Sequence, residues 1–81
     1  MIRPIHVRMA RAALSWTVRD LEAKSKVGRN TISRFEAGNE ILASSLANLE
    51  KALVDEGIIF FDGDAMHGTG VGLKKRKRSK L

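Results

Sequence analysis

The chain has 81 residues, no cysteine and a net charge of +6 at pH 7. This length suits one small domain, and the lack of cysteine excludes a disulfide framework, a thiolate metal site and a cysteine nucleophile. No apolar run approaches the roughly 20 residues of a membrane span, and arginines interrupt the N-terminal segment, so we expect a cytoplasmic protein without a signal peptide.

The first predicted helix covers about residues 4–14. Pro4 suits the first turn of a helix, because the backbone N–H that proline lacks has no partner within the helix at that position. Apolar side chains then recur at the helical spacing, at Val7, Ala10, Ala13 and Leu14. The pattern predicts an amphipathic helix that packs against the rest of the domain.

The second predicted helix follows Thr17 and ends near Ser25. The sequence T-V-R-D at 17–20 has the form of a capping box, in which Thr17 and Asp20 bond each other's backbone N–H. Trp16 and Leu21 occupy the staple positions on either side. We therefore expect the tryptophan to pack at the helix junction, with a ligand-stacking role as the alternative.

The third predicted helix covers about residues 29–37, between an N-cap at Gly28 and a closing Gly38. Its inner face has Ile32 and Phe35. Its outer face carries arginine, asparagine and serine in place of the strong helix formers that a solvated face prefers. These residue types indicate a helix face that binds a partner. A generic polar helix face is the alternative. The spacing of the second and third helices is that of a helix-turn-helix.

A fourth helix is predicted after residue 43, with Ser44 or Ser45 as its N-cap and Gly57 as its end. Leu46, Leu49 and Leu53 recur within it at the spacing of one helix face.

A short β-hairpin is predicted at residues 58–73. The continuous apolar run Ile58-Ile59-Phe60-Phe61 predicts one strand, and Val71-Gly72-Leu73 is expected to pair with it. A strand with one wet face would alternate, whereas this one is apolar on both sides. We expect a second copy of the chain to cover it, with residues 58–61 in the dimer interface.

Charge is distributed unevenly along the chain. Residues 1–34 hold eight bases and two acids, residues 35–73 hold one base and seven acids, and KKRKRSKL at the end adds six bases. This distribution favours a polyanion at one end of the molecule. Residues 74–81 are too charged to pack and are expected to form a disordered basic tail, which adds affinity for any DNA; a solubility or RNA-binding tail is the alternative.

Residues 7–57 resemble the Cro and lambda-repressor-type helix-turn-helix family, whose members are often called XRE-type regulators. The resemblance lies in ARAALSW at the end of the first helix, in Leu21 and Val27, in NTISRFEAG, and in SSLANLEKALVDEG. It implies a mainly α-helical fold in which residues 1–57 form a four-helix, lambda-repressor-like helix-turn-helix domain. The hairpin at 58–73 and the tail at 74–81 follow it.

The resemblance implies that the third helix lies in the major groove of DNA while the second crosses the backbone. The residues expected to contact bases are Arg29, Asn30, Ser33 and Arg34. Arginine can bond guanine, asparagine can bond adenine, and serine can bond several base edges. The residues expected to contact phosphates are Thr17, Arg19, Lys26, Thr31, Lys74, Lys75 and Arg76.

The sequence departs from the family pattern at three positions. Val18 replaces a glutamine that often contacts a phosphate, Glu22 replaces a small residue at the helix crossing, and Lys26 replaces the turn glycine. A lysine at positive φ costs on the order of 1 kcal/mol. Pairing of Glu22 with Lys26 is expected to offset about 0.2 to 0.5 kcal/mol of that cost. We expect a somewhat wider crossing of the two helices.

Glu36 is assigned a structural role, as an internal acid of the family that pairs with an arginine of the first helix. Arg8, Arg11 and Arg19 can each be a phosphate contact, a solvated charge or the partner of Glu36, and Arg19, near the start of the second helix, is the best placed for a phosphate.

We therefore predict a sequence-specific regulator of transcription, most simply a repressor, that binds a palindromic operator in double-stranded DNA as a homodimer. Two alternatives stay open: an antitoxin-type autoregulator that also binds a toxin, and an RNA-binding or ribosome-associated protein. His6 and His67 have no metal ligands at suitable spacing, and no catalytic motif is present, so we expect no metal, no cofactor and no enzyme activity.

Overall fold

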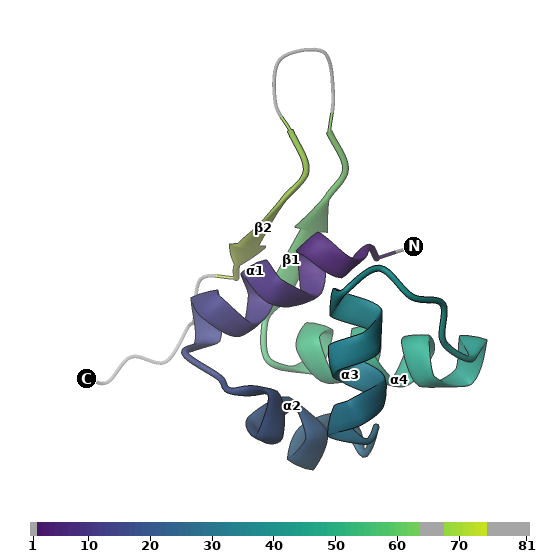
Figure 1. The fold of residues 1–81 in the computed structure, drawn as a ribbon. Helices are drawn as coiled ribbons and strands as arrows, with labels where there is room; N and C mark the ends of the chain where they lie inside the picture. Colours follow the sequence, from purple (N-terminus) through teal and green to yellow (C-terminus); the bar gives the residue numbers. More distant parts are fainter. Residues whose placement is uncertain (1, 64–67, 75–81) are drawn as a thin grey trace.

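The computed structural model describes residues 2–63 and 68–74, so His67 and the tail from Lys75 onward lie outside the described residues. In the described part, four α-helices are followed by one antiparallel β-hairpin (Figure 1). The elements are α1 (Pro4–Leu14), α2 (Val18–Ser25), α3 (Arg29–Glu36), α4 (Ala43–Asp55), β1 (Ile58–Phe61) and β2 (Gly70–Leu73). The predicted fold class, a mainly helical domain with a short C-terminal hairpin, is confirmed.

The ends of α1 and α2 are set by local hydrogen bonds. The predicted capping box of α2 is present, with Asp20 N donating to Thr17 Oγ1 at 3.1 Å and Thr17 N donating to Asp20 Oδ2 at 2.8 Å. At the end of α1, Ser15 takes a left-handed conformation with a φ of 58°, which lets Trp16 N donate to Arg11 O at 2.8 Å. The sequence does not predict this turn, because serine has no preference for positive φ.

The end of α3 lies one residue earlier than predicted, because Ala37 is the C-cap of the helix. Gly38 then takes a φ of 102°, as expected for a glycine that closes a helix. Gly38 N donates to Phe35 O at 2.9 Å and Asn39 N donates to Arg34 O at 2.9 Å. These two bonds form a Schellman motif, which satisfies carbonyl groups at the helix end.

The predicted start of α4 was wrong. The helix begins at Ala43, with Leu42 as its N-cap, so Ser44 and Ser45 lie inside the first turn. Leu46 N already donates to Leu42 O at 3.0 Å, so the first helical hydrogen bond starts before either serine. Leu42 has no side-chain acceptor, and the N-terminal N–H groups of α4 therefore lack the usual side-chain cap. Gly57, with a φ of 96°, ends this region as predicted.

The core lies where the four helices and the hairpin meet. Its buried apolar residues are Ile2, Val7, Ala10, Leu21, Val27, Ile32, Phe35, Leu49, Ala52, Leu53 and Ile58. Leu14 and the predicted packing residue Trp16 pack against this core, whereas Ala13 is exposed. Helix α1 packs against both α3 and β2, so it lies between the helix-turn-helix and the hairpin.

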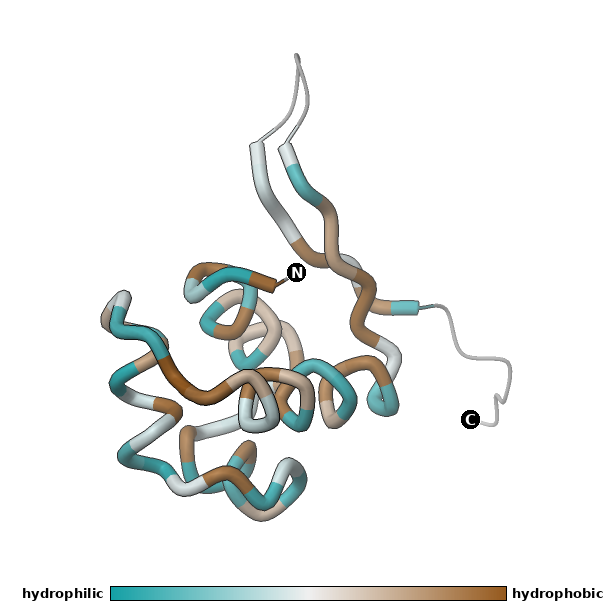
Figure 2. The backbone as a smooth tube through the Cα atoms, turned by 90° about the vertical axis from the view of Figure 1, so that its right-hand side faces the viewer, coloured by the Kyte–Doolittle hydropathy of each residue, from teal (hydrophilic) through white to brown (hydrophobic). Residues whose placement is uncertain are grey.

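The hairpin pairs Ile58 with Leu73 and Phe61 with Gly70, so β2 starts one residue earlier than predicted. Ile58 is 2% exposed and Phe60 is half-buried against the core, whereas Ile59 and Phe61 are exposed. Figure 2 shows this apolar segment passing from the helices into the projecting hairpin. Of the four residues predicted to form a dimer interface, Ile59 and Phe61 alone are exposed; the interface itself stays a prediction.

A buried histidine joins α1 to the hairpin. His6 is 1% exposed, and its ring lies edge-to-face with Phe60 at 5.3 Å between centroids. Arg3 N donates to Nδ1 of His6 at 2.9 Å, while Nε2 lies 2.9 Å from the carbonyl oxygen of Phe61. Because a backbone N–H can only donate, the neutral ring carries its proton on Nε2 and donates it to Phe61.

Candidate nucleic-acid interface

The outer face of α3 presents four polar side chains to solvent. Arg29, Asn30, Ser33 and Arg34 are all exposed. On the opposite face Ile32 is fully buried and Phe35 is 7% exposed. The packing of these two residues therefore fixes which side of α3 faces outward, and the polar groups that can bond base edges lie together on that side.

The turn between α2 and α3 has the conformation that the family pattern implied for its glycine position. Lys26 takes a φ of 65° and its N donates to Glu22 O at 2.8 Å. The Glu22 carboxylate does not make the expected pair with Lys26. Instead, Oε2 of Glu22 accepts a hydrogen bond of 3.2 Å from the backbone N–H of Arg29. Glu22 thus accepts a hydrogen bond from a backbone N–H that has no partner within α3, and its negative charge stabilises the start of this helix.

An ion pair ties α1 to the end of α3. Arg11 Nε donates to Glu36 Oε2 at 2.7 Å and Arg11 Nη2 donates to Glu36 Oε1 at 2.8 Å, with side chains 21% and 9% exposed. Arg11 also donates to Trp16 O at 3.1 Å. The hydrogen bonds to Glu36, more than the charge attraction, raise the pKa of Arg11 above its ordinary value, against the opposing effect of burial. The structural role predicted for Glu36 is confirmed.

Arg8 and Arg19, the other two arginines considered as partners of Glu36, have exposed side chains. Arg8 Nη1 makes a long contact of 3.4 Å with the carbonyl oxygen of Glu36. Arg19 lies in the first turn of α2 and is exposed. With Arg11 engaged by Glu36, Arg8 and Arg19 are the two of these three arginines with exposed side chains, and a phosphate contact by either stays a prediction.

The predicted phosphate contacts fall into two groups. Thr17, Arg19 and Lys26 are exposed around α2, and Thr31 is half-buried on α3. The Thr17 oxygen accepts from Asp20, which leaves its own O–H able to donate. Lys74, by contrast, follows β2, and its backbone N donates to Gly57 O at the far end of α4. Lys75 and Arg76 lie outside the described residues.

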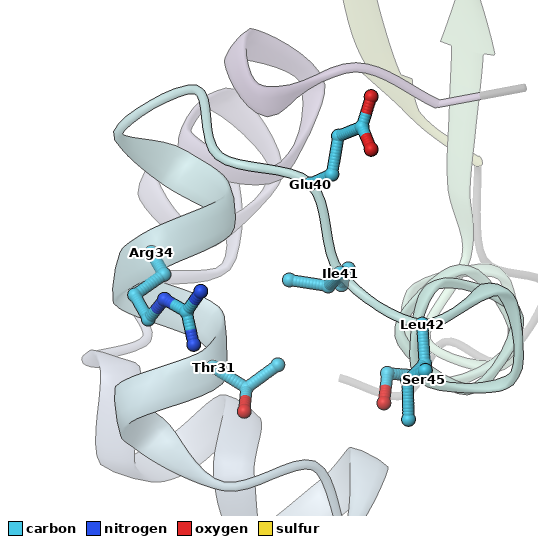
Figure 3. Close-up of a pocket in the computed structure, with 6 residues that line it drawn as sticks. All are labelled: Thr31, Arg34, Glu40, Ile41, Leu42 and Ser45. Carbon is cyan, nitrogen blue, oxygen red and sulfur yellow. The ribbon is translucent and has the colours of Figure 1, made fainter.

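A hollow lies beside α3, between this helix and the start of α4 (Figure 3). Its lining residues are Thr31, Arg34, Glu40, Ile41, Leu42 and Ser45. The Arg34 guanidinium reaches over the hollow, and Ile41 extends from the connecting loop toward α3. Leu42 is 74% exposed, the highest exposed fraction among the large apolar residues of the described chain.

Leu42 was not singled out from the sequence. It follows Ile41 and lies four residues before Leu46, so its spacing continues the apolar stripe of the fourth helix, although its side chain is exposed. Thr31 and Arg34 offer hydrogen-bond donors at this hollow, whereas Glu40 places a carboxylate in the same lining.

Two short helices joined by a three-residue turn, with a polar outer face on the second, define the helix-turn-helix class of DNA-binding proteins. A family model described as helix-turn-helix matches residues 7–53, which is more than half of the chain. The chain belongs to the Cro and lambda-repressor-type, or XRE, helix-turn-helix family of DNA-binding regulators. Neither the curated proteins nor the solved structures compared with the chain include a match. Within the described residues, no helix has the length and apolar character needed to cross a membrane.

Proposed function

We propose that the protein represses transcription by binding a specific double-stranded DNA site through α3. The observation that carries this proposal is the exposure of Arg29, Asn30, Ser33 and Arg34 on one side of a helix anchored by Ile32 and Phe35. Arginine and asparagine can each make two hydrogen bonds to one base, which contributes about 1–3 kcal/mol of discrimination per contact. A protein bound in this way would exclude RNA polymerase from an overlapping promoter.

Phosphate contacts around α2 would fix the orientation of α3 in the groove. Thr17, Arg19, Lys26 and Thr31 supply donors on either side of the turn. Such contacts carry no sequence information, but each neutralised phosphate makes binding fall more steeply with salt. The tail residues Lys74, Lys75 and Arg76 would add affinity of the same sequence-independent kind.

The proposed assembly is a homodimer on a palindromic operator in the cytoplasm. Two α3 helices related by a two-fold axis would enter successive major grooves on one face of the duplex, with half-sites roughly 34 Å apart. Symmetry of the protein would then be mirrored in the symmetry of the DNA site.

The test is to select bound duplexes from a random pool and then to change α3. Substitution of Arg29→Ala with Asn30→Ala is expected to abolish the preference for the selected sequence, a loss of at least about 30-fold in specific over nonspecific affinity. The matched control is Lys51→Ala with Asn48→Ala, which removes one positive charge and one amide from the exposed side of α4. An unchanged preference in the α3 variant would overturn the proposal.

The same experiment separates the alternatives. If removing residues 74–81 abolishes binding while the α3 variant binds normally, the basic tail dominates and an RNA-binding role is favoured. An antitoxin role is favoured by the exposed apolar side chains of the hairpin, Ile59 and Phe61, which are suited to a protein partner. Co-purification of a small enzyme with the native protein would support that role.

A further inference from the structure

Glu22 makes a hydrogen bond on each side of the turn between α2 and α3. Its backbone carbonyl oxygen accepts from Lys26 N at 2.8 Å, at the end of α2, and its Oε2 accepts from Arg29 N at 3.2 Å, at the start of α3. The turn itself is residues 26–28. One residue of α2 therefore closes its own helix with its backbone and bonds the next helix with its side chain.

The buried part of the turn ends before α3 begins. Val27 is 4% exposed and its N donates to Ser25 Oγ at 3.1 Å, so the turn is anchored as far as residue 27. A Cβ added to Gly28 would meet no other atom within 4 Å, so side-chain packing does not reach the next residue.

The first turn of α3 has few other restraints. Ile32 is the first fully buried residue of the helix, and both Arg29 and Asn30 before it are exposed. Gly28, the N-cap, has no side chain that could bond the first N–H groups of the helix. Among the described residues, the Glu22 carboxylate is the one side-chain group that bonds a backbone N–H at the start of α3.

We propose that Glu22 is a positioning residue for sequence recognition, which fixes the start of α3 relative to the phosphate contacts of α2. Phosphate contacts set the register of a protein on DNA, and base contacts specify the sequence. In the proposed function the first group lies around α2 and the second on α3, so selectivity depends on a fixed geometry between the two helices. The Glu22 bond acts at the backbone of Arg29, one of the residues proposed to contact bases.

This inference deepens the proposed function and rests on it. Side chains of a binding site have to be held within about 0.5 Å of their productive positions, and neighbouring groups supply that precision. At an unpacked helix start, a directional hydrogen bond from the preceding helix can do so. Loss of the bond should therefore reduce discrimination between sequences.

The first test compares Glu22→Ala with Glu22→Gln in the full chain. We measure the ratio of affinities for the selected duplex and for a scrambled one, and expect Glu22→Ala to lower it about fivefold. Glu22→Gln keeps an acceptor oxygen and should retain most of the ratio. The matched control is Glu50→Ala, which removes a half-buried glutamate from α4 and should leave the ratio unchanged. A wild-type ratio in Glu22→Ala would overturn the inference.

The second test separates positioning from helix capping. Gly28 has a φ of −59° and a ψ of 144°, which serine can adopt, and a serine at this position can cap α3 locally. Glu22→Ala alone should raise the unfolding equilibrium constant about fivefold, and adding Gly28→Ser should reverse this change. The affinity ratio should stay low in the double variant, because a serine at residue 28 does not join α3 to α2. If the ratio recovers together with stability, Glu22 is only a cap and the inference is wrong.

A third measurement needs no DNA. Hydrogen exchange of the Arg29 amide, followed by NMR, should be faster in Glu22→Ala and close to the wild-type rate in Glu22→Gln. The double variant should also exchange quickly, because an N-cap serine bonds the second or third N–H of a helix and not the first. Equal exchange rates in the wild type and in Glu22→Ala would show that the bond does not hold the start of α3.

These outcomes are distinct from the one that decides the proposed function. If Arg29→Ala with Asn30→Ala keeps the wild-type sequence preference, the proposed function fails, and the inference about recognition fails with it even if amide exchange detects the Glu22 bond. If that variant loses the preference while Glu22→Ala keeps it, the proposed function stands and the role of Glu22 is wrong.

Discussion

The outer face of α3 and the outer face of β1 have opposite chemistry, although both elements stand on the same core. Ile32 and Phe35 anchor α3, and Ile58 anchors β1. Outside, α3 presents arginine, asparagine and serine, whereas β1 presents isoleucine and phenylalanine. The inner residues explain why each element folds where it does. The outer residues are unnecessary for that packing, so their chemistry is the basis for the ligands proposed for the two faces: a polyanion at α3 and an apolar protein surface at β1.

The two elements are also held to α1 in different ways. A charged pair, Arg11 with Glu36, joins α1 to α3, and a neutral histidine joins α1 to β1. If these contacts are the separate anchors of the two faces, each can be removed with a different consequence.

The largest effect is expected from Glu36→Ala. Its loss leaves the Arg11 guanidinium largely buried without its carboxylate, and we expect the free energy of unfolding to fall by about 3 kcal/mol, measured by urea denaturation. The control is Asp55→Ala, which removes an exposed pair with Lys51 and should change stability by less than about 0.5 kcal/mol. Equal effects of the two variants would show that the Arg11 pair is not a special anchor of α3.

A smaller effect is expected from His6→Phe, which keeps an aromatic ring but removes both ring nitrogens. The backbone N–H of Arg3 and the carbonyl oxygen of Phe61 lose their partner, so stability should fall by about 2 kcal/mol. Because the histidine orients the end of β1, the dimer should weaken while the sequence preference of α3 persists. Sedimentation and DNA binding on the same sample measure the two effects. A parallel loss of sequence preference would contradict the separation of the two faces.

Much of this arrangement could be predicted from the sequence, because its determinants are local. Pro4, the Thr17 box, and glycines 28, 38 and 57 mark helix ends through their own backbone preferences, and the structure places these ends at or within two residues of them. The start of α4 was predicted wrongly because a local residue preference was misleading there. Serine is a good N-cap in isolation, but here Leu42, with its extended backbone, is the N-cap, so the helix begins before either serine.

The tertiary contacts of the site were less predictable. The pairing of Glu36 with an arginine was expected, but Arg8 and Arg11 of α1 and Arg19 of α2 were all candidates, and packing of α1 on α3 selects Arg11. The contacts of His6 with Phe61 and of Glu22 with Arg29 join residues whose proximity depends on the complete fold. Local spacing instead suggested that Glu22 pairs with Lys26, an interaction of only a few tenths of a kcal/mol that the start of α3 outcompetes.

The smallest expected change, in Lys26→Gly, separates stability from DNA binding within the helix-turn-helix itself. Lysine at a φ of 65° is strained and glycine is not, so the free energy of unfolding should rise by about 1 kcal/mol in urea denaturation. If Lys26 contacts a phosphate, the same variant should bind DNA more weakly, with a salt dependence of log K reduced by about 0.9. Ser15→Gly is the matched control, because Ser15 also has a positive φ, of 58°, but lies at the end of α1. It should gain similar stability with no change in the salt dependence. A Lys26→Gly variant that is more stable and binds DNA as well as the wild type would remove Lys26 from the phosphate-binding group and leave Thr17 and Arg19 to orient α3.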